Sequence, residues 1–358
     1  MSKLNLDVIG IVGVPANYGG FETLAQRLIE NEEFSRTYNI RIFCSSSSYA
    51  EKKSNYLGAD LFYLPFKANG FQSILYDSLS ILISIFSKTD VVLILGISGA
   101  IFIPLIKLCT HKKVVVNIDG MESKRDKWPN YVRKILKLFE NIAVRWADII
   151  ISDNAVIKQY IKSEYKKDSE MIAYGGDKNK IKKSPPVFIN GNEKFYLSIC
   201  RIEKENNVKL ILDAFANNKE QKLFFIGNWN STKYGIKLRN DYSNFDNINL
   251  IEPIYDESLL NYLRSNAQGY IHGHSAGGTN PSLVEAMFFR AKIFAFNCNF
   301  NVNTLGKNNG IFFDDAQSLS RLLREKHLKY DYKKVIEYAK SNYNWHSISQ
   351  KYISVLKK

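Results

Sequence analysis

Cysteine is scarce in this sequence. The 358 residues include four of them, Cys44, Cys109, Cys200 and Cys298. They lie far apart inside apolar runs, and their spacing fits neither a disulfide framework nor a zinc site. We therefore expect buried, free thiols in a protein of a reducing compartment.

The signatures of several functional classes are also missing. The sequence has no RNA-binding aromatic motif, no zinc-ligand spacing and no single arginine-rich arm, so nucleic acid is the least supported partner. It has no HExxH segment, and we find no serine or cysteine in the setting of a catalytic nucleophile. Gly13, Gly19 and Gly20 follow an apolar segment, but they lack the GxGxxG spacing of dinucleotide-binding proteins.

A spanning helix needs about 20 apolar residues, and no run of that length is present. The most hydrophobic region, Phe71–Cys109, is split by the polar segment Ser87–Asp90. We expect core helices near Ile74–Phe86 and Ile101–Cys109, with an exposed apolar face lying on a membrane as the alternative. Met1–Leu6 is too short and too polar to be a signal peptide.

The composition is that of a globular protein, with 45% hydrophobic and 23% charged residues. A chain of 358 residues is too long for one small core, so we expect two domains. The net charge is +14 and the pI about 9.3. Such an excess of positive charge is suited to binding nucleic acid, an anionic membrane surface or a polyphosphorylated substrate. Charge alone does not distinguish these three partners.

Apolar strand patterns alternate with helical patterns, which predicts parallel, doubly wound α/β sheets. The expected strands are Val8–Val12, Ile40–Cys44, Leu61–Leu64, Val91–Leu95, Val114–Ile118 and Ile149–Ser152, followed by Phe195–Ile199, Leu223–Ile226, Ile248–Leu250, Gly269–His272 and Ile293–Phe296. Residues 175–192 have the composition of a linker. We therefore place one domain at residues 1–178 and the other at residues 190–344.

Ligands of parallel sheets bind outside the carboxyl ends of the strands. The loops at those ends are 13–20, 96–99, 119–127, 201–207 and 272–281. Two domains whose loops face each other would form a cleft, and we expect the chemistry there.

The last of these loops has the features of an anion site. Asn280 is a good N-cap and Pro281 suits the first position of a helix expected at Ser282–Phe289, which would leave free N–H groups for a phosphate. Glu285 shares a helix face with Ser282, and its carboxylate suits a neutral polyol such as a ribose diol. The alternative is an ordinary turn with a solvated glutamate.

Two further loops carry candidate side chains. Asp119 follows an expected strand and could polarise an attacking hydroxyl or hold a sugar hydroxyl, while Lys124, Arg125 and Lys127 could meet phosphate; a solvated charged loop is the alternative. Arg201 could clamp a diphosphate, or it could be a surface arginine paired with an acid of its own loop, Glu203 or Glu205.

Two histidines flank Gly273. His272 and His274 form an H-x-H pair, but no carboxylate or cysteine completes a ligand set. We therefore expect no metal site.

Several of these segments together resemble the GT-B-fold glycosyltransferases of family 4. The segments are 15–23 (PANYGGFET), 119–128 (DGMESKRDKW), 173–177 (AYGGD), 201–207 (RIEKENN) and 272–287 (HGHSAGGTNPSLVEAM). Within that family, the sequence resembles the bacterial, DUF1972-type rhamnosyltransferase-like group, which builds surface polysaccharides. The resemblance covers essentially the whole chain.

The resemblance implies a GT-B fold, in which two Rossmann-like, doubly wound parallel-sheet domains face a cleft. Residues 1–178 would bind the acceptor, with a terminal helix in residues 345–358 crossing back to them, and residues 190–344 would bind a nucleotide-diphosphate sugar. Enzymes of this family retain the anomeric configuration and need no metal, so no cofactor is expected.

The resemblance also implies roles for single residues. Glu285 would bind the ribose hydroxyls, Ser282 and Leu283 behind the Asn280 cap would donate backbone N–H groups to the diphosphate, and Arg201 would neutralise the leaving group. Gly19 and Gly20 would let the backbone approach the donor. The expected acceptor or phosphate contacts are Tyr18, Glu22, Glu122, Lys124, Arg125 and His274.

The sequence departs from the wider family at three positions. Asn206 replaces the usual lysine, Gly277 replaces the first acid of the E-x7-E pattern, and Asp119 takes the place of a histidine. Lys124 or Arg125 would then supply the missing positive charge, and Asp119 would take an orienting role together with Arg201 in catalysis.

The leading hypothesis is a retaining glycosyltransferase at the cytoplasmic face of the inner membrane. It would move a sugar, with rhamnose from dTDP-rhamnose as the first candidate, onto a polyprenyl-diphosphate-linked saccharide of capsule or O-antigen. One alternative is a GT-B-fold sugar-nucleotide epimerase that uses Asp119 and Glu122. The other is a basic, non-enzymatic protein that binds nucleic acid or acts as a scaffold.

Overall fold

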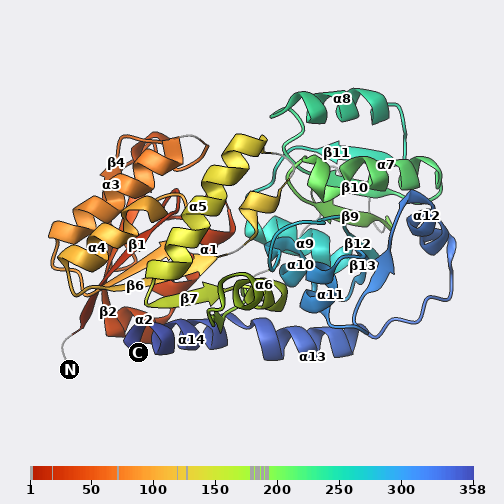
Figure 1. Ribbon diagram of the computed structural model, residues 1–358. Helices are drawn as coiled ribbons and strands as arrows, with labels where there is room; N and C mark the ends of the chain where they lie inside the picture. Colours follow the sequence, from red (N-terminus) through yellow and green to blue (C-terminus); the bar gives the residue numbers. More distant parts are fainter. Residues whose placement is uncertain are drawn as a thin grey trace. The chain divides into compact units, whose positions relative to one another are not determined.

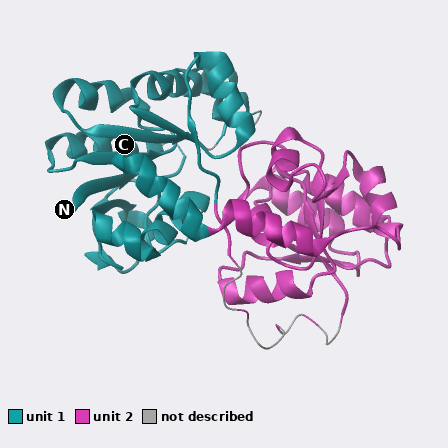
Figure 2. Cartoon of the chain, turned by 90° about the horizontal axis from the view of Figure 1, so that it is seen from below, with its two compact units in different colours: residues 1–174, 345–358 teal, residues 175–344 magenta. Residues whose placement is uncertain are grey.

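A computed structural model describes residues 3–17, 19–70, 72–118, 120–125, 128–177, 181, 186, 189 and 193–358. The chain divides into two compact units, which Figure 2 shows in different colours. Unit 1 consists of Met1–Tyr174 and Trp345–Lys358, and unit 2 of Gly175–Asn344.

Unit 1 contains an eight-stranded sheet with the order β3-β4-β2-β1-β5-β6-β7-β8. The strands are β1 (Leu4–Ile9), β2 (Tyr38–Ser45), β3 (Asn55–Tyr56), β4 (Ala59–Leu64), β5 (Val91–Leu95), β6 (Lys113–Ile118), β7 (Ile149–Ser152) and β8 (Glu170–Met171). All neighbours run parallel except β3 and β4. β5, near the centre of the sheet, is apolar and buried along its whole length, as a strand covered on both faces is expected to be.

The helices of unit 1 form two packed groups (Figure 1). One group contains α3 (Gln72–Phe86), α4 (Ile103–Cys109), α5 (Asn130–Trp146) and α6 (Ala155–Tyr165), with the short turns η2 (Ala100–Phe102) and η3 (Glu122–Lys124). The other contains α1 (Gly20–Glu30), α2 (Glu32–Thr37) and α14 (Trp345–Lys357). Right-handed crossovers in opposite directions from β1 place such groups on opposite faces of the sheet.

The terminal helix α14 packs within unit 1. Tyr352 accepts a hydrogen bond from the Asn117 side chain at 2.6 Å, and Tyr38 donates one to the Ile353 carbonyl at 3.2 Å. Trp345 packs edge-on against Tyr174, with ring centroids 4.9 Å apart. These contacts join the last helix of the chain to the sheet of the first unit.

Unit 2 contains a six-stranded parallel sheet with the order β11-β10-β9-β12-β13-β14. Its strands are β9 (Tyr196–Ile199), β10 (Leu223–Ile226), β11 (Ile248–Ile251), β12 (Gly269–His272), β13 (Lys292–Phe296) and β14 (Ile311–Phe313). Its helices are η4 (Lys204–Asn206), α7 (Val208–Ala216), α8 (Lys233–Tyr242), α9 (Glu257–Asn266), α10 (Pro281–Ala286), α11 (Asn299–Leu305), α12 (Ala316–Arg324) and α13 (Tyr332–Tyr343). Two buried apolar clusters include inward-facing side chains of this sheet.

The predicted fold class is confirmed, since both units are α/β with parallel sheets. The first strand is a local error: we expected Val8–Val12, but β1 ends at Ile9. Gly10 has a φ of +93°, and a Cβ there would clash with the Leu95 carbonyl, so the chain must leave the strand at a glycine. The helix expected at Ser282–Phe289 is also shorter, because α10 ends at Ala286.

The cysteine prediction is partly wrong. All four thiols are free, but Cys109 lies exposed at the end of α4. Among the described residues, no helix combines the length and the hydrophobicity that crossing a bilayer requires.

A buried carboxylate ties several elements of unit 1 together. Asp7 on β1 is 2% exposed and accepts two hydrogen bonds from Arg41 on β2, at 2.9 and 2.6 Å. It also accepts hydrogen bonds from the hydroxyls of Ser84, at 2.6 Å, and Thr89, at 2.7 Å. The network joins β1, β2, α3 and the segment that follows α3.

Replacing Asp7 with alanine is expected to lower the free energy of unfolding by about 3 kcal/mol, because a guanidinium and two hydroxyls lose their common acceptor. Urea denaturation followed by circular dichroism measures the change. Asp60→Ala, at an exposed position of β4, is the matched control and should stay within about 0.5 kcal/mol of the parent. Equal losses for the two variants would contradict the role of Asp7.

Candidate functional site

Two loops of unit 2 meet where β9 and β12, neighbours in the sheet, reach their carboxyl ends. A Cβ at Gly273 would clash with the Asn206 carbonyl, so the two backbones approach as closely as only glycine allows. Asn207 donates to the Gly273 carbonyl at 2.8 Å, and the Ser275 amide donates to the Glu205 carbonyl at 2.9 Å. The loops therefore form one connected edge of the sheet.

Asn206 and His274 form a hydrogen-bonded pair at this edge. The Asn206 amide nitrogen donates to the Arg201 carbonyl at 2.6 Å, so its oxygen faces His274 Nδ1, 2.5 Å away. An amide oxygen only accepts, so Nδ1 of the His274 imidazole carries a proton and donates it to Asn206. A Cβ at Gly277 would lie 3.0 Å from Nε2 of the same imidazole, and Gly277 has a φ of +109°.

Arg201 lies just beyond the end of β9. Its side chain is 55% exposed, and its guanidinium is 3.9 Å from a carboxylate oxygen of Glu203. An ion pair at that distance and exposure is weak. The pairing with an acid of its own loop is therefore present, but more than half of the Arg201 side chain remains exposed.

Glu285 on α10 is paired with a cation that the sequence analysis missed. Arg264 on α9 is 4% exposed, and its guanidinium donates to Glu285 Oε2 and, at 3.1 Å, to Asn261. The Glu285 side chain itself is partly exposed. A signal for Arg264 was present, because an arginine on the apolar side of a helix needs an acceptor inside the fold.

The start of α10 confirms Asn280 as the N-cap and corrects one expectation. Asn280 Oδ1 accepts from the Ser282 amide at 3.1 Å and from its hydroxyl at 2.8 Å. The Asn280 carbonyl accepts from the amides of Leu283 at 3.2 Å and Val284 at 3.1 Å. The Ser282 and Leu283 N–H groups, expected to be free, are thus held by Asn280, since a capping side chain satisfies these donors.

The second histidine, His272, is fully inside unit 2. It is 1% exposed, its Nε2 has no hydrogen-bond partner, and burial lowers its pKa to about 3. It is therefore neutral at physiological pH. Within the described parts of the chain, no three histidine, cysteine or acidic side chains gather as a metal site would require.

The segment Gly273–Gly277 reads GHSAG, which formally fits the GxSxG pattern of a nucleophile elbow. The Ser275 hydroxyl donates to the Glu205 carbonyl at 2.8 Å, and α10 begins only at Pro281. An elbow instead presents its serine on a sharp turn that enters the helix directly. Ser275 therefore connects the two loops rather than presenting a nucleophile.

The glycine loop of unit 1 differs from what we expected. Glu22 was expected to face an acceptor, but it is 5% exposed and accepts from the Val12 amide at 2.7 Å. Burial raises its pKa, and the Val12 hydrogen bond opposes that rise. Gly19 precedes α1 and Gly20 begins it, and a Cβ at Gly19 would come within 3.0 Å of the Glu22 carboxylate.

The charged loop after β6 is partly engaged in internal contacts. Glu122 accepts from the Arg125 guanidinium and, at 3.0 Å, from the Trp128 indole, while the Lys124 ammonium lies 4.2 Å from the centre of the Tyr160 ring. Arg125 and Lys124 are thus held on unit 1. The predicted residues Asp119, Tyr18 and Lys127 lie outside the described residues.

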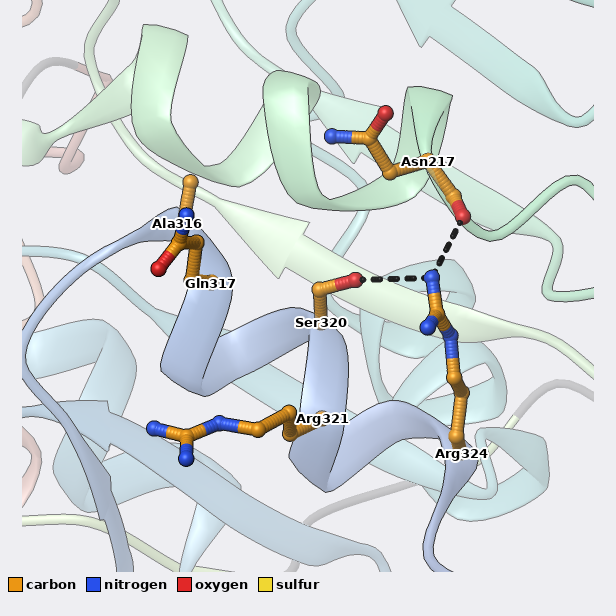
Figure 3. A pocket seen from close by; sticks show the side chains of 6 residues that line it. All are labelled: Asn217, Ala316, Gln317, Ser320, Arg321 and Arg324. Carbon is orange, nitrogen blue, oxygen red and sulfur yellow. Dashed lines mark hydrogen bonds between the residues drawn. The ribbon is translucent and has the colours of Figure 1, made fainter.

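Figure 3 shows a cavity of about 480 Å³ elsewhere on unit 2, between the end of α7 and α12. It is lined by Asn217, Ala316, Gln317, Ser320, Arg321 and Arg324. Arg324 donates to the Asn217 carbonyl at 3.0 Å and to Ser320 at 3.4 Å, which holds its guanidinium against the cavity wall. None of the predicted site residues lines this cavity.

Two family models match the chain, one over each half. Residues 4–177 match a domain of unknown function, DUF1972, and residues 179–342 match the family described as glycosyl transferases group 1. The resemblance to glycosyltransferases is thus confirmed at the level of the group 1 domain. A search of curated protein sequences finds no significant match.

Solved structures share the fold over nearly the whole length. A sucrose-phosphate synthase from Thermosynechococcus elongatus has a TM-score of 0.81 at 12% identity, with 99% of this chain and 98% of that chain covered. HepE from Anabaena, in complex with UDP and glucose, has a TM-score of 0.76 at 13% identity, with 99% and 100% covered. An E. coli structure described as trehalose-6-phosphate bound with UDP-2-fluoro glucose has a TM-score of 0.73 at 10% identity, with 99% of each covered. These matches show the GT-B fold.

The buried His272 predicts a specific pH dependence. In the unfolded chain the His272 imidazole has a pKa near 6.5, whereas in the folded protein its pKa is about 3. The unfolded chain therefore binds the proton first, and stability is lost as the pH falls below about 6.5. Between pH 6.5 and 5 the loss should reach about 2 kcal/mol, and His272→Gln should remove it. Urea denaturation at both pH values measures the difference.

The matched control is His327→Gln, because His327 is exposed. That variant should keep the pH dependence of the parent. An unchanged pH dependence in His272→Gln would show that His272 titrates normally in the folded protein.

Proposed function

We propose that the protein is a retaining glycosyltransferase that uses a nucleotide-diphosphate sugar as donor. Two findings support this function: residues 179–342 match the glycosyl transferases group 1 family, and structures of the same fold contain UDP with glucose or UDP-2-fluoro glucose. The observation that carries the proposal is the carboxyl edge of β9 and β12. There a partly exposed acid, Glu285, is held by a buried arginine, and Arg201 follows the neighbouring strand.

Glu285 suits the ribose of the donor. One of its oxygens accepts from Arg264, which fixes the orientation of the carboxylate, and the side chain remains partly exposed. A fixed carboxylate is a strong acceptor for a vicinal diol, since hydrogen bonds to charged groups are stronger than neutral ones. Because Arg264 is itself buried, the acid is positioned before a ligand arrives.

Arg201 suits the diphosphate. Its exposed guanidinium can donate two parallel hydrogen bonds to phosphate oxygens, and it stabilises the charge that develops when the sugar leaves. In a retaining transfer by same-face attack, the departing diphosphate takes the proton of the acceptor hydroxyl. Electrostatic stabilisation of that leaving group is then the main catalytic task, and no metal is required for it.

The diphosphate also requires a rearrangement at α10. The Ser282 and Leu283 amides are held by Asn280, so donation to phosphate would need the cap to release them. His274 Nε2 lies 3.0 Å from where a Cβ of residue 277 would stand, a position at which the wider family carries an acid, and we propose that this imidazole contacts the reacting sugar.

The finer assignment follows the resemblance. The donor sugar would be rhamnose, carried by dTDP, and the acceptor a polyprenyl-diphosphate-linked saccharide of a surface polysaccharide. Asp119 would orient the acceptor hydroxyl. A protein with a net charge of +14 is suited to the anionic inner leaflet where such acceptors reside, so we place its work at the cytoplasmic face of that membrane.

Glu285→Gln is expected to weaken donor binding at least tenfold, because the ribose diol loses a charged acceptor and Arg264 loses its partner. A panel of nucleotide sugars, with dTDP-rhamnose and UDP-glucose among them, is tested for the shift each produces in the melting temperature. The nucleotide sugar that shifts the parent most is then titrated against the variant.

Glu257→Gln, an exposed acid on the first turn of α9, serves as the control for the panel. It should bind donor as the parent does. If no nucleotide sugar shifts the parent, or if Glu285→Gln binds as tightly as the parent, the assigned role is wrong.

Arg201→Ala should lower kcat by roughly 100-fold while changing the donor Kd much less, because the guanidinium is needed most when the leaving group carries its charge. Release of the nucleoside diphosphate in the presence of donor and acceptor measures turnover. Arg239→Ala, which removes another partly exposed, ion-paired arginine of unit 2, is the control and should leave turnover unchanged. Equal kcat in Arg201→Ala and the parent would remove Arg201 from the mechanism.

A further inference from the structure

Two neighbouring helices of unit 1 carry apolar side chains on the side that faces solvent. The exposed residues are Ile101, Leu105 and Leu108 along η2 and α4, and Tyr131, Ile135 and Leu138 along α5. We call these six residues the apolar face. Leu108 is 73% and Tyr131 64% exposed, which is high for side chains of this size.

The spacing shows that each set is one continuous stripe. In α5 the residues stand at positions i, i+4 and i+7, which lie on the same side of a helix. In α4, Leu105 and Leu108 stand at i and i+3, and Ile101 precedes them in the turn η2. The opposite side of α5 contributes Phe139, Ala143 and Val144 to the core, so the helix does not need its outward stripe for packing. α3 packs beside α4 and adds Phe86, which is 89% exposed, at its end.

The exposed charges on these helices are of one sign. The acid of α3, Asp77, and the acid of α5, Glu140, are both buried, and α4 contains no acid. The exposed charged residues of α5 are Lys134, level with the middle of its apolar stripe, and Arg145, about two turns beyond the last residue of the stripe. At the angular spacing of a helix, both lie beside that stripe and not across from it.

We infer that the apolar face, with Lys134 and Arg145 beside it, docks unit 1 on the surface of an anionic phospholipid bilayer. An amphipathic surface with apolar side chains in the middle and cations at the edge suits the boundary between headgroups and acyl chains. Trp146, part-exposed at the end of α5, and Tyr131 at its start are side chains that favour this boundary. Lys134 and Arg145 contact lipid phosphates.

A second copy of the chain fits the same surface less well. Two copies joined through this face would bring Lys134 and Arg145 of each close to the cations of the other, on chains that already carry +14 each. An anionic bilayer, by contrast, attracts these positive charges. No described helix could span the membrane, so the docking is interfacial.

The inference deepens the proposed function, because it names the surface that would bring the enzyme to a lipid-linked acceptor. Only this link to the acceptor rests on the proposed function. The physical argument depends on exposure, spacing and charge. Vesicle binding can therefore be measured without donor, and donor binding without vesicles, so that failure of one is distinguishable from failure of the other.

The test is cosedimentation of the full chain with phosphatidylcholine vesicles and with vesicles that also contain phosphatidylglycerol. The parent should bind the anionic vesicles, more weakly at high salt, and bind pure phosphatidylcholine poorly. The double variant Leu108→Gln/Ile135→Gln should bind the anionic vesicles at least tenfold less. Its matched control is Ile236→Gln, an exposed isoleucine on α8 of unit 2, which should bind like the parent.

A second pair of variants isolates the charges. Lys134→Gln/Arg145→Gln should lower binding to anionic vesicles and reduce its salt dependence, whereas Lys219→Gln/Lys237→Gln, at exposed positions of unit 2, should have a smaller effect. Each variant must keep the melting temperature of the parent. If the Leu108→Gln/Ile135→Gln variant does not keep that melting temperature, the single variant Leu105→Ser is used in its place.

Three results would overturn the inference. The parent could fail to bind anionic vesicles, or the unit 2 controls could lose as much binding as the unit 1 variants. Sedimentation velocity could instead show a parent dimer that Leu108→Gln/Ile135→Gln converts to monomer, which would assign the apolar face to a second copy. If vesicle binding persists but no nucleotide sugar binds, the docking surface stands and the proposed enzymatic function falls.

Discussion

The close approach of two backbones at the carboxyl ends of β9 and β12 is the constraint on which the candidate site depends. Gly273 lies so near the Asn206 carbonyl that no side chain fits between them. That approach lets Asn207 reach the Gly273 carbonyl, Ser275 reach Glu205, and His274 reach Asn206. A larger residue at position 273 would separate the loops and remove these contacts together, because each spans the same gap.

Glu285 depends on a second constraint, which comes from α9. Its partner Arg264 is almost wholly buried, and a buried guanidinium without an acceptor is strongly unfavourable. The ion pair therefore stabilises unit 2 and also holds the acid at the edge of the sheet. Under the proposed function, one interaction would serve both packing and ligand recognition, so a test of the ribose contact must report donor affinity and stability separately.

Several elements could be predicted because their pattern is local. β5, β7 and β12 occupy the residues expected from apolar runs, and Asn280 caps α10 as its side chain and Pro281 predict. β3 and β8 have two residues each, too few for any pattern. The burial of Glu22 and the choice of Glu285 as the partner of Arg264 could not be derived from spacing, because each depends on which distant segment a helix meets.

Two departures from the wider glycosyltransferase pattern are connected in the structure. The resemblance implies a lysine at the position of Asn206 and an acid at that of Gly277, so by that comparison one positive and one negative charge are absent together. His274 contacts both positions: its Nδ1 bonds to Asn206, and its Nε2 lies where a side chain of residue 277 would begin. A hydrogen-bonded pair of side chains, Asn206 and His274, thus occupies the region where both of the residues implied by the resemblance would lie. Arg201 and Lys204 are the basic residues of loop 201–207, so under the proposed function a diphosphate at this edge would depend on them and on no lysine at position 206.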